Sequence, residues 1–130
     1  MTFVRALSIL CCLMAGCTLV PPVDGGRALV FFQTWSADLD ESALQSIRSV
    51  ATVARLHPNY QIWVEGYADL TGSVAANKLI SETRAQVVAD TLLKEGVSAG
   101  QIRQLSFGQV GTAQHSQESR RVVLITESNP

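Results

Sequence analysis

The sequence predicts an α/β sandwich of the α+β class, in which two helices pack on one face of a mixed β-sheet. Four short segments have the composition or the alternation of apolar residues that is typical of strands, and two longer segments have a helical period. Their order along the chain is β-α-β-α-β-β. Because each helix joins two strands, both helices are expected to cross the same sheet and to cover one of its faces.

The first strand and the first helix are expected to follow each other closely. The segment RALVFFQ, residues 27–33, is apolar and rich in aromatic residues, as strands often are. Residues 34–58 then change to a helical period. Asp38 or Asp40 is expected to cap the start of this helix, and Pro58 follows its end. The side of the helix that faces the core is expected to carry Leu44, Ile47, Val50, Ala51 and Ala54.

The other three strands are expected on either side of the second helix. In NYQIWVEGY, residues 59–67, apolar and polar side chains alternate, which predicts a half-buried strand. QIRQLSFG, residues 101–108, and RRVVLIT, residues 120–126, are two further strand candidates. The polar segment 109–119 is expected to join them as a loop.

The second helix is expected at residues 74–96. Ser73 or Thr71 is expected to cap its start, and Gly96 is expected to end it. At about 100° per residue, one stripe of this helix is apolar at its carboxyl end and therefore faces the core, but it is polar at its amino end. The stripe consists of Asn77, Ser81, Arg84, Val88 and Leu92.

Arg84 is the residue of this stripe that requires an explanation. Burying a guanidinium without an anion costs roughly several kcal/mol. Asp69, in the preceding loop, is the nearest acidic candidate for a partner of Arg84. One interpretation is an Asp69–Arg84 salt bridge that fixes the loop to the helix. The other is a site in which Asp69 holds the ammonium and Arg84 the carboxylate of one zwitterionic ligand. Residue types and spacing leave both interpretations open.

The amino-terminal residues predict export from the cytoplasm. A basic start with Arg5, the apolar run ALSILCCLMAG and then Cys17 are typical of a signal peptide, and the run is too short to span a membrane. The segment LMAGC resembles a bacterial lipobox, which implies cleavage before Cys17 and acylation of its thiol and amino group. Residues 1–16 are then a signal peptide and residues 17–27 a lipidated flexible tether, followed by one domain at residues 28–127. The alternative is an ordinary secretory peptide with incidental cysteines.

Composition excludes several classes of site and partner. All three cysteines lie at or before Cys17, so the expected domain has no disulfide and no thiolate ligand. The chain has two histidines, His57 and His115, which argues against a histidine-based metal site, and no cofactor is expected. A net charge of −1 is not that of a general nucleic-acid binder.

Four short motifs follow one another between about Ala28 and Thr126. VEGYAD resembles the pattern V-x-G-H-T-D, and TGS resembles x-G-S. NKLISETRA resembles N-x-x-L-S-x-x-R-A, and SRRVVL resembles N-R-R-V at the last strand. In this order, and with Asp69 and Arg84 fifteen residues apart, they resemble the pattern of the OmpA-like peptidoglycan-binding domain. The resemblance implies an OmpA-C-like fold.

The resemblance also implies a noncovalent site for the diaminopimelate end of the peptidoglycan stem peptide. The ligand's ammonium would meet Asp69, and its carboxylate would meet the fork of Arg84. Asn77 matches the family's helix asparagine and would hydrogen-bond the ligand or hold the preceding loop. The remaining matched positions are Tyr67, Gly72, Ser73, Arg120 and Arg121, of which the two arginines either border the groove or are solvated charges of a strand.

The sequence departs from the family pattern near these positions. Tyr67 stands where the family has histidine, Ala68 where it has threonine, and Ser119 where it has asparagine. The loop from Gly108 to Arg120 is several residues shorter than is usual and lacks the family's proline segment. These changes alter the hydrogen bonding beside Asp69 and one wall of the expected site.

The resemblance implies a non-catalytic lipoprotein of the outer membrane whose domain faces the periplasm and grips the cell wall. No constellation of general acid, general base, nucleophile or metal ligands is apparent, so an enzyme is not expected. A Tol-type or other envelope protein is a possible partner of such a lipoprotein. The alternative function is an accessory lipoprotein of an envelope or secretion complex that acts through protein contacts, for which Trp35 and Trp63 are candidates.

Overall fold

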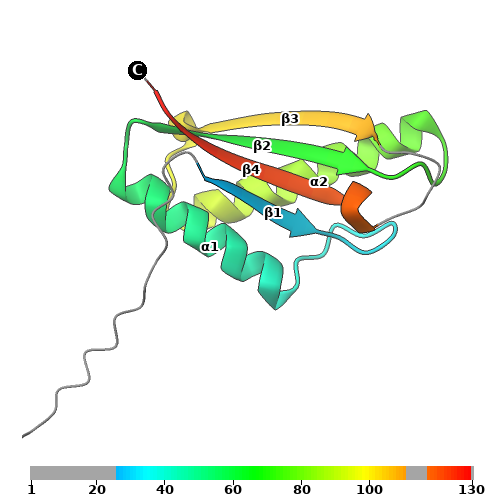
Figure 1. Cartoon of the computed structure of the whole chain (residues 1–130), viewed down its shortest axis with the longest axis horizontal. Coiled ribbons are helices and arrows are strands. Elements are labelled where there is room, and N and C mark those ends of the chain that lie inside the picture. The colour runs from blue at the N-terminus through cyan, green and yellow to red at the C-terminus, as the bar shows by residue number, and fades with distance from the viewer. Residues whose placement is uncertain (1–25, 111–116, 130) are drawn as a thin grey trace, which may run out of the picture.

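The computed structural model describes residues 26–110 and 117–129, and these form a sheet with helices on one face (Figure 1). Two short 3₁₀ helices precede β3 and β4. The expected class and the expected order β-α-β-α-β-β are confirmed. The main elements are β1 (Arg27–Phe31), α1 (Glu41–Leu56), β2 (Tyr60–Ala68), α2 (Val74–Lys94), β3 (Ile102–Gln109) and β4 (Arg121–Ser128).

The sheet is mixed, with the strand order β1-β4-β2-β3. β4 is antiparallel to both of its neighbours, whereas β2 and β3 are parallel. As a result β1, β2 and β3 all run in one direction, as their arrowheads show in Figure 1. The carboxyl ends of these three strands therefore lie at one end of the sheet, and Arg27, where β1 begins, lies at the other end.

Helix α1 begins at Glu41, and Asp40, one of the two expected caps, is the residue that caps it. Residues 34–35 form a turn, and the side chain of Asp40 accepts a hydrogen bond from the amide of Ala43 at 2.7 Å. Of the five residues expected to face the core, Leu44 is only half-buried because it lies at the margin of the helix face. The other four are buried as expected.

Helix α2 packs closely on β2 because of a glycine. A Cβ atom at Gly66 would lie 2.2 Å from the backbone oxygen of Ser81, so a side chain there would push the helix off the strand. Ser73 is the cap, since its hydroxyl accepts a hydrogen bond from the amide of Ala76 at 3.1 Å. Gly96, with φ +88°, follows the last turn in the left-handed conformation that favours glycine. The expected stripe of α2 is buried along its whole length.

The core lies between the helices and one face of the sheet. Its largest apolar members include Phe32, Ile47, Ile62, Leu92 and Leu124. We call the other face the open sheet face, since the figures show both helices on the side opposite to it. None of the described helices is long and apolar enough to cross a membrane.

Candidate ligand-binding site

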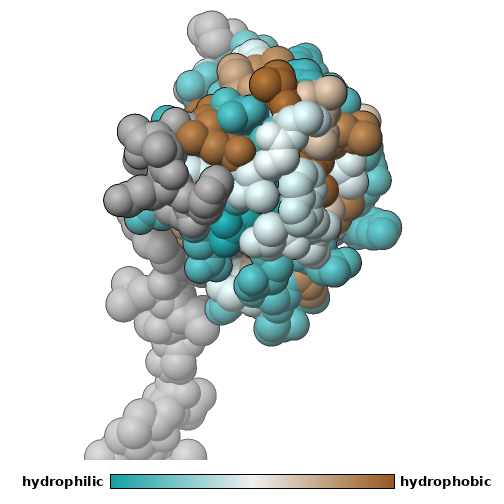
Figure 2. Space-filling model, turned by 90° about the vertical axis from the view of Figure 1, so that its right-hand side faces the viewer, coloured by the Kyte–Doolittle hydropathy of each residue, from teal (hydrophilic) through white to brown (hydrophobic). Residues whose placement is uncertain are grey.

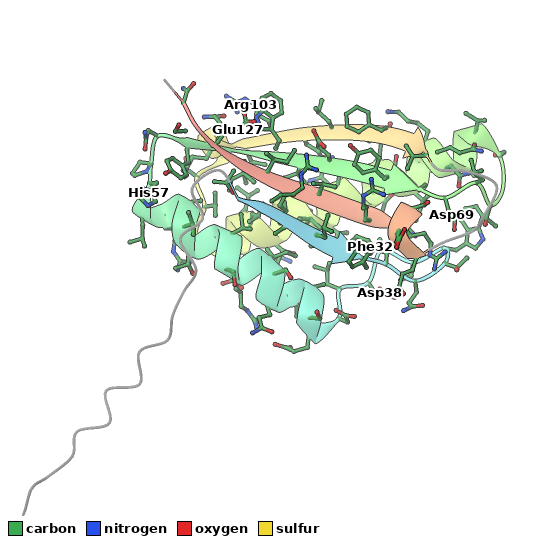
Figure 3. All side chains as sticks on the ribbon, viewed as in Figure 1. Phe32, Asp38, His57, Asp69, Arg103 and Glu127 are labelled. Atoms are coloured by element: carbon green, nitrogen blue, oxygen red, sulfur yellow. The ribbon has the colours of Figure 1, made fainter. Side chains whose placement is uncertain are left out.

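The expected site residues meet at the end of the sheet where β2 leads into α2. Figure 3 labels Asp69 there, at the end of the molecule opposite to His57, and Figure 2 looks at this end of the domain. In Figure 2, apolar residues gather in the upper part of the view and hydrophilic residues in the lower part. A small cavity of about 10 Å³ lies at this end, with room for about one water molecule. It is lined by Thr34, Trp35, Ala68, Asp69, Asn77, Ile80, Arg84 and Arg120.

Arg84 is buried, with 1% of its surface exposed, and its guanidinium is bound by backbone carbonyls. Nε donates to the oxygen of Ser36 at 2.9 Å, and Nη2 donates to the oxygen of Gln33 at 2.9 Å. Nη1 makes a longer bond of 3.4 Å to the oxygen of Tyr67, and the guanidinium carbon lies 5.2 Å from the centre of the Phe32 ring. Arg84 thus joins α2 to β2 and to the segment that follows β1.

This environment carries an electrostatic cost. Burial lowers the pKa of Arg84 to about 10, with the attraction of Asp69 opposing the shift and the charge of Arg120 adding to it. The guanidinium still carries its proton at neutral pH. A buried cation held mainly by neutral carbonyls is a group that gains from an additional anion.

Asp69 is paired with a different arginine from the one that the sequence suggested. It is 5% exposed, and its Oδ2 accepts a hydrogen bond from Nη1 of Arg120 at 2.9 Å. Its Oδ1 accepts a bond from the amide of Thr71 at 2.8 Å. Burial alone would raise the pKa of Asp69, but the bonds from Arg120 and Thr71 outweigh burial and hold the pKa below its ordinary value.

The interpretation of a direct Asp69–Arg84 salt bridge is therefore corrected. Among the described residues, the direct ion pair of Asp69 is formed with Arg120, because the sheet brings the start of β4 beside the end of β2. Asp69 and Arg84 are nevertheless both buried at this end of the sheet. Arg120 lines the cavity with its side chain 13% exposed, so it is not a solvated strand charge.

Asn77 provides an unused hydrogen-bond donor in the cavity wall. The residue is 1% exposed, and its Nδ2 has no hydrogen-bond partner among the described residues. Leaving a buried donor unpaired costs about 1–3 kcal/mol, so a group that accepts from it is stabilising.

Trp35 closes the outer side of the cavity, which sequence reasoning did not assign to the site. Gly72, at φ +90°, leaves the space that its indole occupies, because a Cβ atom there would lie 2.6 Å from the ring. Trp35 itself has a positive φ of 54°, and half of its surface is exposed. In the sequence, an aromatic residue ahead of a polar segment is the signal that could have marked Trp35. The left-handed backbone at Trp35 cannot be predicted from residue types.

Tyr67 and Arg121 do not line the cavity, although both were expected at the site. The Tyr67 hydroxyl donates to Oε2 of Glu65 at 3.0 Å, and its ring stacks on Phe107 with centroids 5.0 Å apart. The Arg121 guanidinium lies 4.7 Å from the centre of the Tyr67 ring. Strand alternation directs both side chains to the open sheet face, and only the backbone oxygen of Tyr67 contributes to the site.

The arrangement fits binding of a small charged group. Within residues 26–110 and 117–129, no group of three or more histidine, cysteine, aspartate or glutamate residues is placed to hold a metal ion.

Several expected features cannot be located in the structure. The expected signal peptide, Cys17, nearly all of the expected tether and His115 lie outside the described residues. So do residues 111–116 of the shortened loop.

Comparisons with known proteins agree on one family. Residues 31–122 match the model of the OmpA family. The chain is 34% identical over 79 residues to a peptidoglycan-associated lipoprotein of Agrobacterium fabrum, covering 61% of this chain and 45% of the relative. It is 33% identical over 99 residues to the probable lipoprotein YiaD of Escherichia coli, covering 72% of this chain and 45% of the relative. The chain thus spans about half the length of these curated relatives.

Solved structures show the same fold. The peptidoglycan-associated lipoprotein of Burkholderia pseudomallei superposes with a TM-score of 0.71 at 24% identity, covering 77% of this chain and 90% of that one. The OmpA-like domain of FopA1 from Francisella tularensis gives a TM-score of 0.71 at 24% identity, covering 80% and 72%. At this level of identity the superposition supports the architecture alone.

Proposed function

Because the chain belongs to the OmpA family, we propose that it binds peptidoglycan noncovalently, through the diaminopimelate end of the stem peptide, and that it has no catalytic role. The observation that carries this proposal is the small cavity in which the buried residues Arg84, Asp69 and Asn77 meet, with the Asn77 Nδ2 unpartnered among the described residues. A zwitterion with an ammonium and a carboxylate on one carbon matches such a set of charges.

The roles follow from the hydrogen bonds already present. A guanidinium has five N–H groups, and three are used by carbonyls, so two remain for the ligand carboxylate. Asn77 Nδ2 donates to the same carboxylate, which ends its unpaired state. The ligand ammonium approaches Asp69 and competes there with Arg120.

The cavity must open to admit this ligand. Its volume of about 10 Å³ is that of about one water molecule. Trp35 is the exposed wall, and Arg120 is held by its bond to Asp69, so both are expected to move when the ligand enters. The positive end of α2 adds a further attraction for the carboxylate.

The test uses Asn77→Leu, which removes the donor while keeping a similar volume. If Asn77 serves the ligand, affinity for soluble muropeptides should fall about tenfold or more, while stability should stay equal or rise because an unpaired donor is lost. Titration with diaminopimelate-type and lysine-type muropeptides, together with thermal melts, measures both quantities. Gln45→Leu, at an exposed position of α1, is the matched control. Unchanged affinity of Asn77→Leu, or equal affinity for the two peptide types, would refute the proposed ligand.

We further propose that acylation at Cys17 attaches the chain to the outer membrane, with the domain in the periplasm. The LMAGC segment supports this proposal. Two of the relatives described above have names that contain the word lipoprotein. A Tol-type or other envelope partner stays a prediction. A domain that is not retained on isolated sacculi would favour the alternative of an accessory protein that acts through protein contacts.

A further inference from the structure

The open sheet face exposes large apolar side chains, although the solvated face of a sheet is commonly polar. Its exposed apolar side chains lie on the two edge strands: Leu29 (41%) and Phe31 (39%) on β1, Leu105 (41%) and Phe107 (51%) on β3. Each edge strand thus carries a strip of two exposed apolar side chains, and exposed apolar surface of this kind commonly marks a place where a protein meets a partner or a membrane. The helices cover only the opposite face, so this surface has no intramolecular partner among the described residues.

A line of residues crosses this face near the end where β1 begins. Arg27 pairs with Ile125, Ile125 with Trp63, and Trp63 with Arg103, so directly paired residues place these four side chains on the same face. Two arginines therefore flank an indole, with about 14 Å between the outer strands. The Trp63 Nε1 donates to Oε2 of Glu127 at 3.2 Å, so the indole also contacts a residue near the carboxyl end of β4. Figure 3 shows Arg103 and Glu127 far from Asp69.

The basic residues of this face lie partly apart from its acidic ones. The outward strand residues include three arginines (Arg27, Arg103, Arg121) and two glutamates (Glu65, Glu127), and Glu118 borders a pocket with Leu29, Phe31 and Arg121, which gives 3 − 3 = 0 for the face. Arg27 and Arg103 belong to the line of residues that crosses the end where β1 begins, whereas Glu118 lies beside the carboxyl end of β1. Arginines next to aromatic and aliphatic side chains are the combination that meets anionic headgroups and the acyl boundary below them.

We propose that the open sheet face docks on an anionic phospholipid surface, with Arg27, Trp63 and Arg103 at the headgroups and the apolar edge residues in shallow contact with the acyl region. This proposal rests on acylation at Cys17, as proposed above. Only nine residues separate Cys17 from Arg27, and nine residues extend at most about 30 Å. The bilayer that holds the anchor is therefore always within reach, and its effective concentration at this face is high.

A fluid lipid surface fits this face better than a rigid protein partner. The apolar residues form two strips on the edge strands, separated by the polar centre with Glu65, Tyr67 and Arg121. Headgroups can surround such a centre, whereas a rigid partner must match its shape. The binding site lies at the carboxyl ends of β1 and β2, so a docked domain keeps that site free.

The test uses Trp63 as its own reporter. The chain has two tryptophans, so Trp35→Phe leaves Trp63 as the single indole, and Cys17→Ser removes acylation at that residue. Vesicles of phosphatidylethanolamine with phosphatidylglycerol should shift the Trp63 emission to shorter wavelength, and nitroxide-labelled lipid should quench it. Vesicles of phosphatidylcholine alone should bind more weakly, and added salt should weaken binding to the anionic vesicles.

Matched variants distinguish binding through this face from nonspecific adsorption of the protein to vesicles. Leu29→Ser with Leu105→Ser should weaken vesicle binding by about tenfold, because both side chains belong to the docking strips. Leu56→Ser with Leu79→Ser should leave it unchanged, although these leucines are more exposed, at 73% and 64%. Arg27→Gln with Arg103→Gln should remove the preference for anionic lipid.

Several outcomes would overturn the proposal. These are an absent Trp63 response to every vesicle, an equal loss in the two leucine pairs, and a Trp63 shift that appears with protein concentration in the absence of lipid. The last result would indicate pairing of two copies through this face. Muropeptide titration of the leucine and arginine variants in a chain that keeps Trp35 is a separate measurement, so failure of lipid docking and failure of peptidoglycan binding are distinguishable. Fatty-acid labelling of the unaltered chain tests the anchor by itself.

Discussion

Replacing Asp69 with asparagine should destabilise the domain strongly, because it removes the anion from a buried pair without changing shape. The carboxylate oxygen and the Arg120 nitrogen are 2.9 Å apart, and the two side chains are 7% and 13% exposed. At an effective dielectric constant of about 20, two unit charges at this distance attract by about 6 kcal/mol. Part of this attraction is offset because an amide costs less to bury than a carboxylate. We therefore expect the free energy of unfolding to fall by about 3–5 kcal/mol.

The pH dependence of stability supplies a second signature of the same pair. The pKa of Asp69 in the folded domain lies below its ordinary value of 3.8, so its contribution is fully present above that value. The contribution is lost as pH falls through the lower, folded pKa. The difference between Asp69→Asn and the unaltered chain should therefore shrink in strongly acidic solution, below about pH 3.8.

Equilibrium urea unfolding at neutral and acidic pH measures both effects. Asp90→Asn is the control, because Asp90 is an exposed aspartate of α2 that accepts one bond from Gln86 at 2.8 Å. The free energy of unfolding of Asp90→Asn should differ from that of the unaltered chain by no more than about 0.5 kcal/mol. A loss below about 1 kcal/mol for Asp69→Asn would be that of an exposed pair and would refute the buried pairing with Arg120.

Three further predictions test the fold and the anchor. Gly66→Ala should destabilise the domain by about 3 kcal/mol or more in urea unfolding, because its Cβ would lie 2.2 Å from the Ser81 oxygen; a small change would mean that α2 shifts easily. Gln101→Ala should cost about 1–3 kcal/mol in the same assay, because its Nε2 serves three backbone carbonyls within 3.2 Å. Cys17→Ser should abolish uptake of labelled fatty acid, and unchanged labelling would remove the lipoprotein proposal.

The sequence predicts the elements and the stripe of α2 well, since both depend on local period. Asn77 and Arg84 are buried on one helix face, as their spacing requires. The partner of Asp69 was not predictable in the same way. Arg120 lies 51 residues away and reaches Asp69 through the antiparallel pairing of β4 with β2. Spacing along one helix cannot contain that information.

The carbonyls that hold Arg84 were also beyond sequence reasoning. Gln33 and Ser36 bind it through backbone oxygens, which every residue type offers, so no side-chain pattern marks them. For Tyr67 and Arg121, matching residues to a family pattern predicted a role at the site, whereas strand alternation turns both side chains to the opposite face. Matching a family pattern identifies a position along the chain, whereas the strand pleat determines to which face of the sheet the side chain points.

The common direction of β1, β2 and β3 has a mechanical consequence. A pull on the residues before Arg27, against a ligand held at Arg84, runs along the strand axes from one end of the sheet to the other. Such a load shears the five residue pairs between β1 and β4 together, from Arg27 with Ile125 to Phe31 with Arg121. Hydrogen bonds that share a shearing load resist it jointly, whereas a load across the strands would open them one after another. With the anchor and the ligand as proposed, the strands of the domain lie along the line of tension between them.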